Sequence, residues 1–234
     1  MVTVVLAHSP LTGPQAWGAL PEHLRRAGVD VVVLDVTEDD APPYAVRYVA
    51  AAATQLGAAD PAGPLLLVGH SGAGYLLPQI GVAQRAARRE VRGYVFLDAG
   101  LPVPRPVSRL DLLAEEDPDT ATELYRLLTA GGRYPTWTAD DLRETVPDDS
   151  RRITLVAGLR PRGADFFTEV LPYPSGEWPD APCGLLQTSP AYDAAARSAR
   201  ARGWPVVERG GGHFAALVDP DGVALDLLRL VEQL

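Results

Sequence analysis

The sequence contains no lysine, so arginine supplies all 21 of its basic residues, and these do not gather into a patch. They are outnumbered by 30 acidic residues, which gives a formal net charge of -9. Phosphate backbones and anionic lipid headgroups repel a surface of this charge. We therefore expect neither nucleic acid nor a membrane surface as a partner.

Cysteine is almost absent as well, because Cys183 stands alone and excludes an internal disulfide. It lies in an apolar, strand-like run without a neighbouring base, which favours a small core residue over a nucleophile. The four histidines are scattered and form no metal-ligand cluster. We therefore expect no metal site.

Long hydrophobic runs are also missing, since no apolar stretch approaches the roughly 20 residues of a membrane span. The opening "MVTVVLAHS" lacks the basic region of a secretion signal. With 47% hydrophobic and 22% charged residues, the composition is that of an ordinary globular protein. We expect residues 1–234 to form a single domain in the cytoplasm.

Buried strands and helices alternate along most of the chain. The expected strands span residues 2–7, 29–36, 63–70, 91–100, 183–189 and 205–210. Helical patterns lie between them, the first over residues 14–28. The last helix is expected to start with Asp219 as its N-cap and Pro220 at its first position. This order predicts an α/β protein with a doubly wound, mostly parallel sheet.

Residues 101–182 interrupt the alternation. This segment is rich in proline and acidic residues, and its short helical pieces include "TATELYRLLTAGG" and "TADDLRETV". We expect a helical lid, inserted between two strand-helix units and folded over one edge of the sheet. "EED", at residues 115–117, is expected to be a solvated loop or a helix start.

The stretch "GPLLLVGHSGAGYLLPQ" places Ser71 at the end of the third strand, where sites of parallel sheets lie. Gly69, Gly72, Ala73 and Gly74 are small enough for a strained strand-to-helix turn that lifts the hydroxyl into a cleft. The Gly72 N–H would then lie at a helix start and could stabilise an oxyanion. A glycine-rich anion-binding turn is the alternative, but neither a G-x-G-x-x-G pattern nor a P-loop lysine is present.

A nucleophilic serine needs a base, and His213 is the best-placed histidine. It stands in the glycine-rich "ERGGGHFAALVDP", after the last strand and before the last helix, at the same end of the sheet. His8 and His70 are expected to be structural hydrogen-bonding residues, and His23 to face solvent on the first helix.

Together, "VGHSGAG", "LAHSPLTGPQAW" and "GGGHF" resemble the α/β-hydrolase fold superfamily over essentially the whole chain. The resemblance implies a catalytic triad in the order Ser, acid, His. The family calls the turn around its serine the nucleophile elbow and gives it the pattern G-x-S-x-G. Here Ala73 holds the last position of this pattern, and alanine is still small.

Two carboxylates compete for the role of the acid. The commonest family position is the loop after the strand that follows the lid, but Asp193 in "LLQTSPAYDA" comes two or three residues late. The other family position, at the end of the strand after the elbow helix, holds Asp98 in "YVFLDAGLP". We favour Asp98 as the residue that orients His213, and its alternative role is to cap the loop into the lid.

The loop that follows the first strand, from His8 to Thr12, departs from the family pattern, and we call it the oxyanion loop. In the family the residue after a His-Gly pair donates a backbone N–H, but here His8-Ser9 is followed by Pro10, which has none. We expect Gly72 and Leu11 to supply the two donors. The alternatives are a side chain such as Ser9 or Thr12, or a weaker hole.

Six aromatic residues of the lid could line an apolar substrate pocket or form the lid's own small core. They are Trp137, Tyr134, Phe166, Phe167, Tyr173 and Trp178.

Three functions are compatible with these residues. The leading hypothesis is a serine hydrolase without metal or organic cofactor, which cleaves an ester, lactone or similar acyl bond of a small molecule. The altered oxyanion loop motivates a second, a lyase, elimination or cyclisation enzyme similar to hydroxynitrile lyases. A ligand-binding protein that has lost catalysis is a third, against which the presence of both Ser71 and His213 counts.

Overall fold

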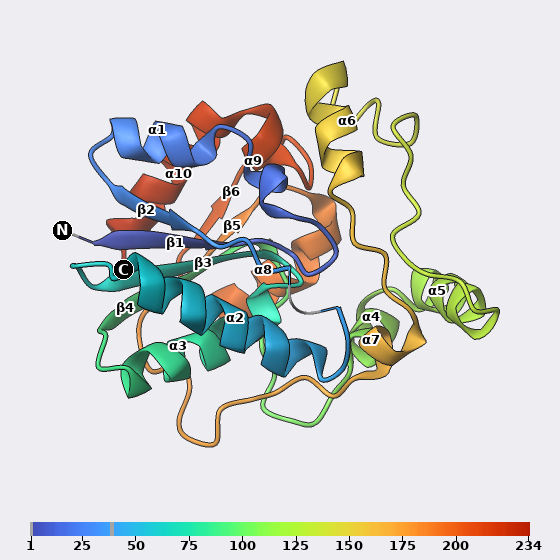
Figure 1. Ribbon diagram of the computed structural model, residues 1–234, viewed down its shortest axis with the longest axis horizontal. Coiled ribbons are helices and arrows are strands. Elements are labelled where there is room, and N and C mark those ends of the chain that lie inside the picture. The colour runs from blue at the N-terminus through green and yellow to red at the C-terminus, as the bar shows by residue number, and fades with distance from the viewer. Residues whose placement is uncertain (1, 38–39) are drawn as a thin grey trace.

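Six parallel strands form one sheet in the order β2-β1-β3-β4-β5-β6 (Figure 1). The structure is a computed structural model that describes residues 2–37 and 40–234. The strands are β1 (Thr3–Ala7), β2 (Asp30–Val33), β3 (Leu65–Ser71), β4 (Val91–Ala99), β5 (Cys183–Gln187) and β6 (Val206–Glu208). The predicted doubly wound α/β fold is therefore confirmed.

Helices cover both faces of the sheet because its central strands are apolar on both sides. Helices α1 (Leu20–Arg26) and α10 (Pro220–Val231) pack on one face. Helices α2 (Tyr44–Ala59), α3 (Leu77–Ala86) and α8 (Asp193–Ala201) pack on the other. Helix α10 begins as predicted, with Pro220 at its first position and the Asp219 side chain accepting a hydrogen bond from the Gly222 N–H.

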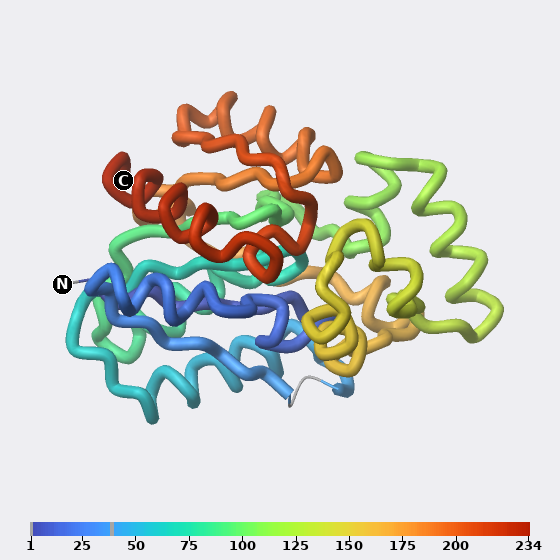
Figure 2. Tube along the Cα trace, turned by 90° about the horizontal axis from the view of Figure 1, so that it is seen from above, coloured from blue at the N-terminus to red at the C-terminus, as the bar shows by residue number. Residues whose placement is uncertain are grey.

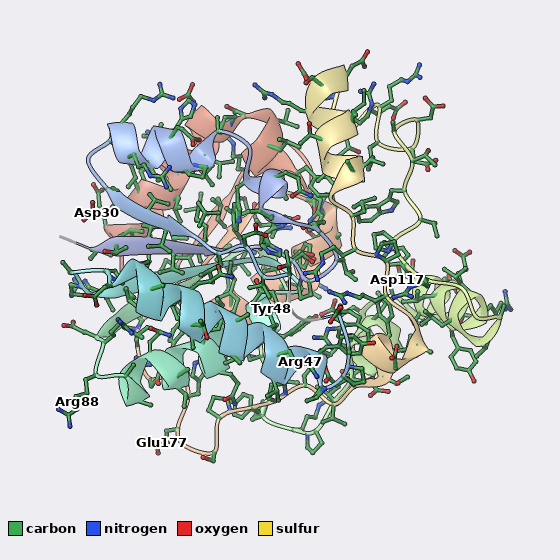
Figure 3. The ribbon with its side chains drawn as sticks, viewed as in Figure 1. Asp30, Arg47, Tyr48, Arg88, Asp117 and Glu177 are labelled. Atoms are coloured by element: carbon green, nitrogen blue, oxygen red, sulfur yellow. The ribbon has the colours of Figure 1, made fainter. Side chains whose placement is uncertain are left out.

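Figure 3 shows a side chain that fills the interior on the face of the sheet covered by α2, α3 and α8. Tyr48 of α2 points inward and is fully buried, and its hydroxyl donates a hydrogen bond to the His8 carbonyl over 2.6 Å. Arg88 and Glu177 lie at the periphery in the same view. Cys183 is buried at the start of β5, in agreement with its expected role in the core.

Most of the segment between β4 and β5 lies beyond the carboxyl ends of the strands in both Figure 1 and Figure 2. Its last part, which includes Glu177, returns past α3 to the start of β5. The segment contains α4 (Arg109–Glu116), α5 (Pro118–Thr129), α6 (Asp149–Ala157) and α7 (Ala164–Thr168). Of "EED", two residues end α4 and the third, Asp117, is the N-cap of α5. The remaining short elements are α9 (Ala215–Val218) and the 3-10 helices η1 (Pro14–Trp17), η2 (Gly74–Leu76) and η3 (Pro190–Tyr192).

Three local predictions need correction. The helix expected over residues 14–28 is divided into η1 and α1 at Gly18, whose φ of 50° no regular helix accommodates. Strand β2 is shorter and more exposed than expected because it is the edge strand and pairs only with β1. "TADDLRETV" forms consecutive turns, since its hydrogen bonds alternate between three- and four-residue spacing before Pro147.

His23 also differs from its expected place in solvent. Its side chain is only 14% exposed and contacts the Asp221 carboxylate of α10 through Nδ1. Helices α1 and α10 pack side by side on one face of the sheet, so a position that the helical pattern placed outside faces a neighbouring helix. In the described part of the chain, no helix is long and apolar enough to cross a membrane.

Candidate active site

Ser71 ends β3 at a sharp turn into η2 and α3. Its φ is 56°, a left-handed conformation that non-glycine residues rarely adopt. A Cβ at Gly74 would lie 2.2 Å from the Gly100 carbonyl oxygen, so glycine is required there. Ala73 is fully buried, and its methyl group fits where the family pattern has glycine. The small residues that the sequence singled out thus permit a strained turn around the serine.

Asp98 lies in the next strand, β4, and is fully buried. Its Oδ1 accepts hydrogen bonds from the backbone N–H groups of Thr188 and Ser189, both at 2.8 Å. Its Oδ2 lies 2.6 Å from the Ser189 hydroxyl and 2.7 Å from Nδ1 of His213. Burial alone would raise the pKa of Asp98, but hydrogen bonding from His213, Ser189 and Thr188 outweighs it and holds this pKa below its usual value.

His213 lies in the loop between β6 and α9, opposite Asp98. Since the ionised carboxylate only accepts, Nδ1 carries the proton and Nε2 is left as the basic nitrogen. The Asp98 contact therefore selects the tautomer that a general base for Ser71 requires.

His70 contacts His213 through both a hydrogen bond and ring stacking. Its Nε2–H donates to the His213 carbonyl over 2.9 Å, and the two imidazole rings stack with their centroids 4.5 Å apart. Complete burial, followed by the nearby His213, lowers the pKa of His70 to about 3. His70 is therefore a neutral structural residue, as expected from the sequence.

Within the described residues, the other carboxylate that the sequence offered, Asp193, makes no hydrogen bond with His213. It lies in the first turn of α8 and accepts a hydrogen bond from the Gln187 side chain. Of the two candidates, the structure brings Asp98 to His213.

Tyr192 is the residue that sequence reasoning missed. In the described residues, the hydrogen bond of the Ser71 hydroxyl is to the Tyr192 hydroxyl, at 3.1 Å, and none joins it to His213. The Tyr192 ring stacks on the His213 ring with a centroid distance of 5.5 Å and an angle of 15°. Nothing in "SPAYDA" signals this contact, because it depends on the path of the loop.

The loop after β1 passes close to the elbow. Pro10 has no N–H, and the Leu11 N–H donates to the Ser9 hydroxyl over 3.3 Å. A methyl group added at Gly72 would lie 3.6 Å from this hydroxyl oxygen and from Pro10 Cδ. The Ser9 side chain, buried with 1% exposure, therefore lies beside Gly72, the residue that follows Ser71.

The inserted segment holds this loop in place. The Arg162 guanidinium donates to the Pro10 carbonyl over 3.3 and 3.4 Å, and the Arg160 N–H donates to the Leu11 carbonyl over 2.9 Å. His8, at the base of the loop, accepts a hydrogen bond at Nε2 from the Val36 N–H and is fully buried, so its role is structural.

The six insertion aromatics singled out from the sequence divide into packed clusters. Tyr134 packs edge-on against Trp137 and Phe167, and Phe167 against Phe166. Tyr173 and Trp178 belong to a different group, in which Trp178 contacts Tyr94, Phe96 and Trp204. Of the two roles weighed from the sequence, these contacts favour a structural core.

Metal ligands are not assembled in this protein as far as residues 2–37 and 40–234 show, because no three His, Cys, Asp or Glu side chains converge.

Comparisons with known proteins find the same fold in both sequence and structure. The sequence profile described as the "Alpha/beta hydrolase family" matches residues 4–227. Among curated proteins, none matches the sequence. Among solved structures, an extracellular alpha/beta-hydrolase from a Paenibacillus species is 16% identical with a TM-score of 0.77, over 98% of this chain and 99% of its own.

Two further structures are similar over the whole chain. Tomato methylketone synthase I, as an H243A variant complexed with beta-ketoheptanoate, is 15% identical with a TM-score of 0.74, over 99% of this chain and 98% of its own. A pyrethroid hydrolase from Sphingobium faniae JZ-2 is 17% identical with a TM-score of 0.68, with the same coverage. At such identities these likenesses establish the fold alone.

Proposed function

The chain belongs to the alpha/beta hydrolase family, and we propose that it is a serine hydrolase for an ester, lactone or other activated acyl bond of a small, largely apolar molecule. One observation carries this proposal, the hydrogen bond that Asp98 makes with His213 beside the strained Ser71 elbow. It leaves Nε2 of His213 as a base near a serine hydroxyl at the carboxyl end of the sheet.

The reaction would begin when Ser71 Oγ attacks the substrate carbonyl and its proton passes to Nε2 of His213. A hydrogen bond between these two groups, absent from the described resting structure, often tightens only when substrate binds. Asp98 would stabilise the imidazolium, which later protonates the leaving alcohol. Water, activated by the same histidine, would then hydrolyse the acyl group from Ser71.

The oxyanion would be held between the elbow and the loop after β1. The Gly72 N–H is one proposed donor, and the Ser9 O–H takes the place of the Leu11 N–H as the other. The Leu11 N–H is hydrogen-bonded to the Ser9 hydroxyl, so the Ser9 proton is the one directed to the substrate. Such a donor contributes about 3 kcal/mol to transition-state stabilisation.

A fluorophosphonate probe tests the proposal without knowledge of the substrate. We expect intact-mass spectrometry and peptide mapping to show a single label on Ser71. Ser71→Ala and His213→Gln should remain unlabelled, and Ser175→Ala, which removes an exposed serine of the insertion, should label like the native protein. An unlabelled native protein would refute the hydrolase.

Pro10 favours a second candidate function. This is a lyase, elimination or cyclisation enzyme that uses Ser71 and His213 as acid-base groups. Without a backbone donor at this position, the hole is less suited to a tetrahedral oxyanion. Short p-nitrophenyl esters separate the two functions, because a hydrolase turns them over. A lyase would leave them nearly untouched.

A further inference from the structure

Tyr192 belongs to the loop that also holds the acid. Thr188 and Ser189 bind Asp98 at the start of this loop, and Tyr192 ends its 3-10 helix η3 three residues later. The Tyr192 N–H donates to the Ser189 carbonyl, which closes the turn over 3.3 Å. One short segment therefore binds the carboxylate at one end and covers the nucleophile and the base at the other.

The tyrosine contacts both reacting groups with different parts of its side chain. Its hydroxyl lies 3.1 Å from Ser71 Oγ, and its ring lies nearly parallel to the His213 imidazole. The His70 ring also stacks on this imidazole, so two aromatic rings stack on His213. The stacking places the phenol oxygen beside the nucleophile.

The phenol keeps its proton under ordinary conditions. Burial raises the pKa of Tyr192 well above its usual value and exceeds the opposite effect of the Ser71 hydrogen bond. Tyr192 can therefore donate a hydrogen bond but does not act as a base.

We propose that Tyr192 is a further catalytic residue, whose hydroxyl donates a hydrogen bond to Ser71 Oγ during acyl transfer. The proposal rests on the proposed function, in which Ser71 is the nucleophile. The Ser71 proton moves to Nε2 of His213, and the negative charge that develops on Oγ is shared with the phenol O–H. Tyr192 retains its own proton throughout.

The same hydrogen bond acts in the second half of the reaction. When water has added to the acyl-enzyme, the bond between the acyl carbon and Oγ breaks, and the electron pair returns to Oγ. The phenol O–H stabilises this charge until His213 returns the proton. This support matters in a site whose oxyanion loop has lost one backbone N–H at Pro10.

The test compares the rate of fluorophosphonate labelling at Ser71 in native protein, Tyr192→Phe and Tyr125→Phe. Phenylalanine keeps the ring over His213 and removes only the hydroxyl. We expect Y192F to label about 10- to 100-fold more slowly, the range for a hydrogen bond to a charged group. Tyr125 is 56% exposed on α5, and Y125F should label like the native protein.

Two further readouts accompany this test. The pH profile of labelling should keep its native shape in Y192F, because the ring over His213 remains, and this checks that the substitution leaves His213 undisturbed. With p-nitrophenyl acetate, both the acylation burst and the later steady rate should fall, since Oγ carries charge in both steps. A structural contact of the ring alone would leave all of these rates at their native values.

The outcomes are distinct. Y192F that labels at the native rate would overturn this inference alone. Faster labelling would also overturn it, because Tyr192 would then withhold Ser71 from His213. If the native protein is not labelled at Ser71, the proposed function fails and this inference fails with it.

Discussion

Asp98 and His213 are 115 residues apart in the chain, and their side chains are joined by a hydrogen bond of 2.7 Å. Asp98 lies in the fourth strand, with φ of 43°, and His213 lies in the loop after the sixth. The intervening loop after β5 supplies Thr188 and Ser189, which saturate the same carboxylate. The His213 imidazole is thus oriented by a carboxylate that is itself fixed by three further hydrogen bonds.

This relationship predicts unequal effects of the two candidate acids. Asp98→Asn removes the charge that orients His213 and favours the wrong tautomer, so labelling of Ser71 should slow by roughly 1,000-fold or more. Asp193→Asn, which alters a contact with Gln187, should label within about twofold of the native rate. Stopped-flow or mass-spectrometric rates decide the matter, and a strong effect of Asp193→Asn alone would assign the acid to Asp193.

His70 makes stability depend on pH. Its pKa is about 3 in the folded protein and near 6.5 when unfolded, so the unfolded chain binds more protons between these values. His70 should therefore contribute full stability above about pH 6.5 and lose it progressively as pH falls towards 3. The free energy of unfolding should change by up to about 1.4 kcal/mol per pH unit, which is the value for one proton.

Urea unfolding of native protein and His70→Gln from pH 7 to 4 measures this effect. The variant should show a shallower loss of stability with falling pH, whatever its absolute stability. An equally steep loss in both proteins would contradict the neutral, buried state of His70.

Arg162 should control the oxyanion loop from the insertion. Carbonyl and N–H of a trans peptide point in opposite directions, so fixing the Pro10 carbonyl directs the Leu11 N–H towards Ser9. Arg162→Met should slow labelling about 10-fold and lower the free energy of unfolding by about 2 kcal/mol.

The matched control is Arg143→Met, which removes an exposed arginine paired with Asp140. We expect less than about 1 kcal/mol of destabilisation and a native labelling rate from this change. Equal labelling by the two variants would show that the loop does not depend on Arg162.

Ser9 and Thr12 offer the two hydroxyl groups of the same loop, and only Ser9 lies beside Gly72. Ser9→Ala should slow labelling by about 100-fold because an oxyanion donor is lost. Thr12→Val keeps the buried shape and should remain within about threefold of native. A native rate in Ser9→Ala would leave the Leu11 N–H itself as the donor.

Much of the fold could be predicted because its signals are local. Apolar runs of strand length, helical spacing and the Asp219-Pro220 cap each concern neighbouring residues. Prediction was wrong where neighbours in space decide, as for His23, which packs against Asp221 of another helix. "TADDLRETV" has helical spacing, but buried Leu142 and Val146 pack it against Phe214 as consecutive turns.

The sequence by itself determined the parallel α/β sheet and the candidates Ser71 and His213, because strand ends and glycine-rich turns are encoded by adjacent residues. Tertiary structure decided which carboxylate meets His213, where the Leu11 N–H points, and that Tyr192 reaches Ser71. These contacts join loops that follow different strands. A hydrogen bond forms only when the distance between donor and acceptor is correct to within a few tenths of an ångström. No spacing along a chain determines the distances between separate loops that closely.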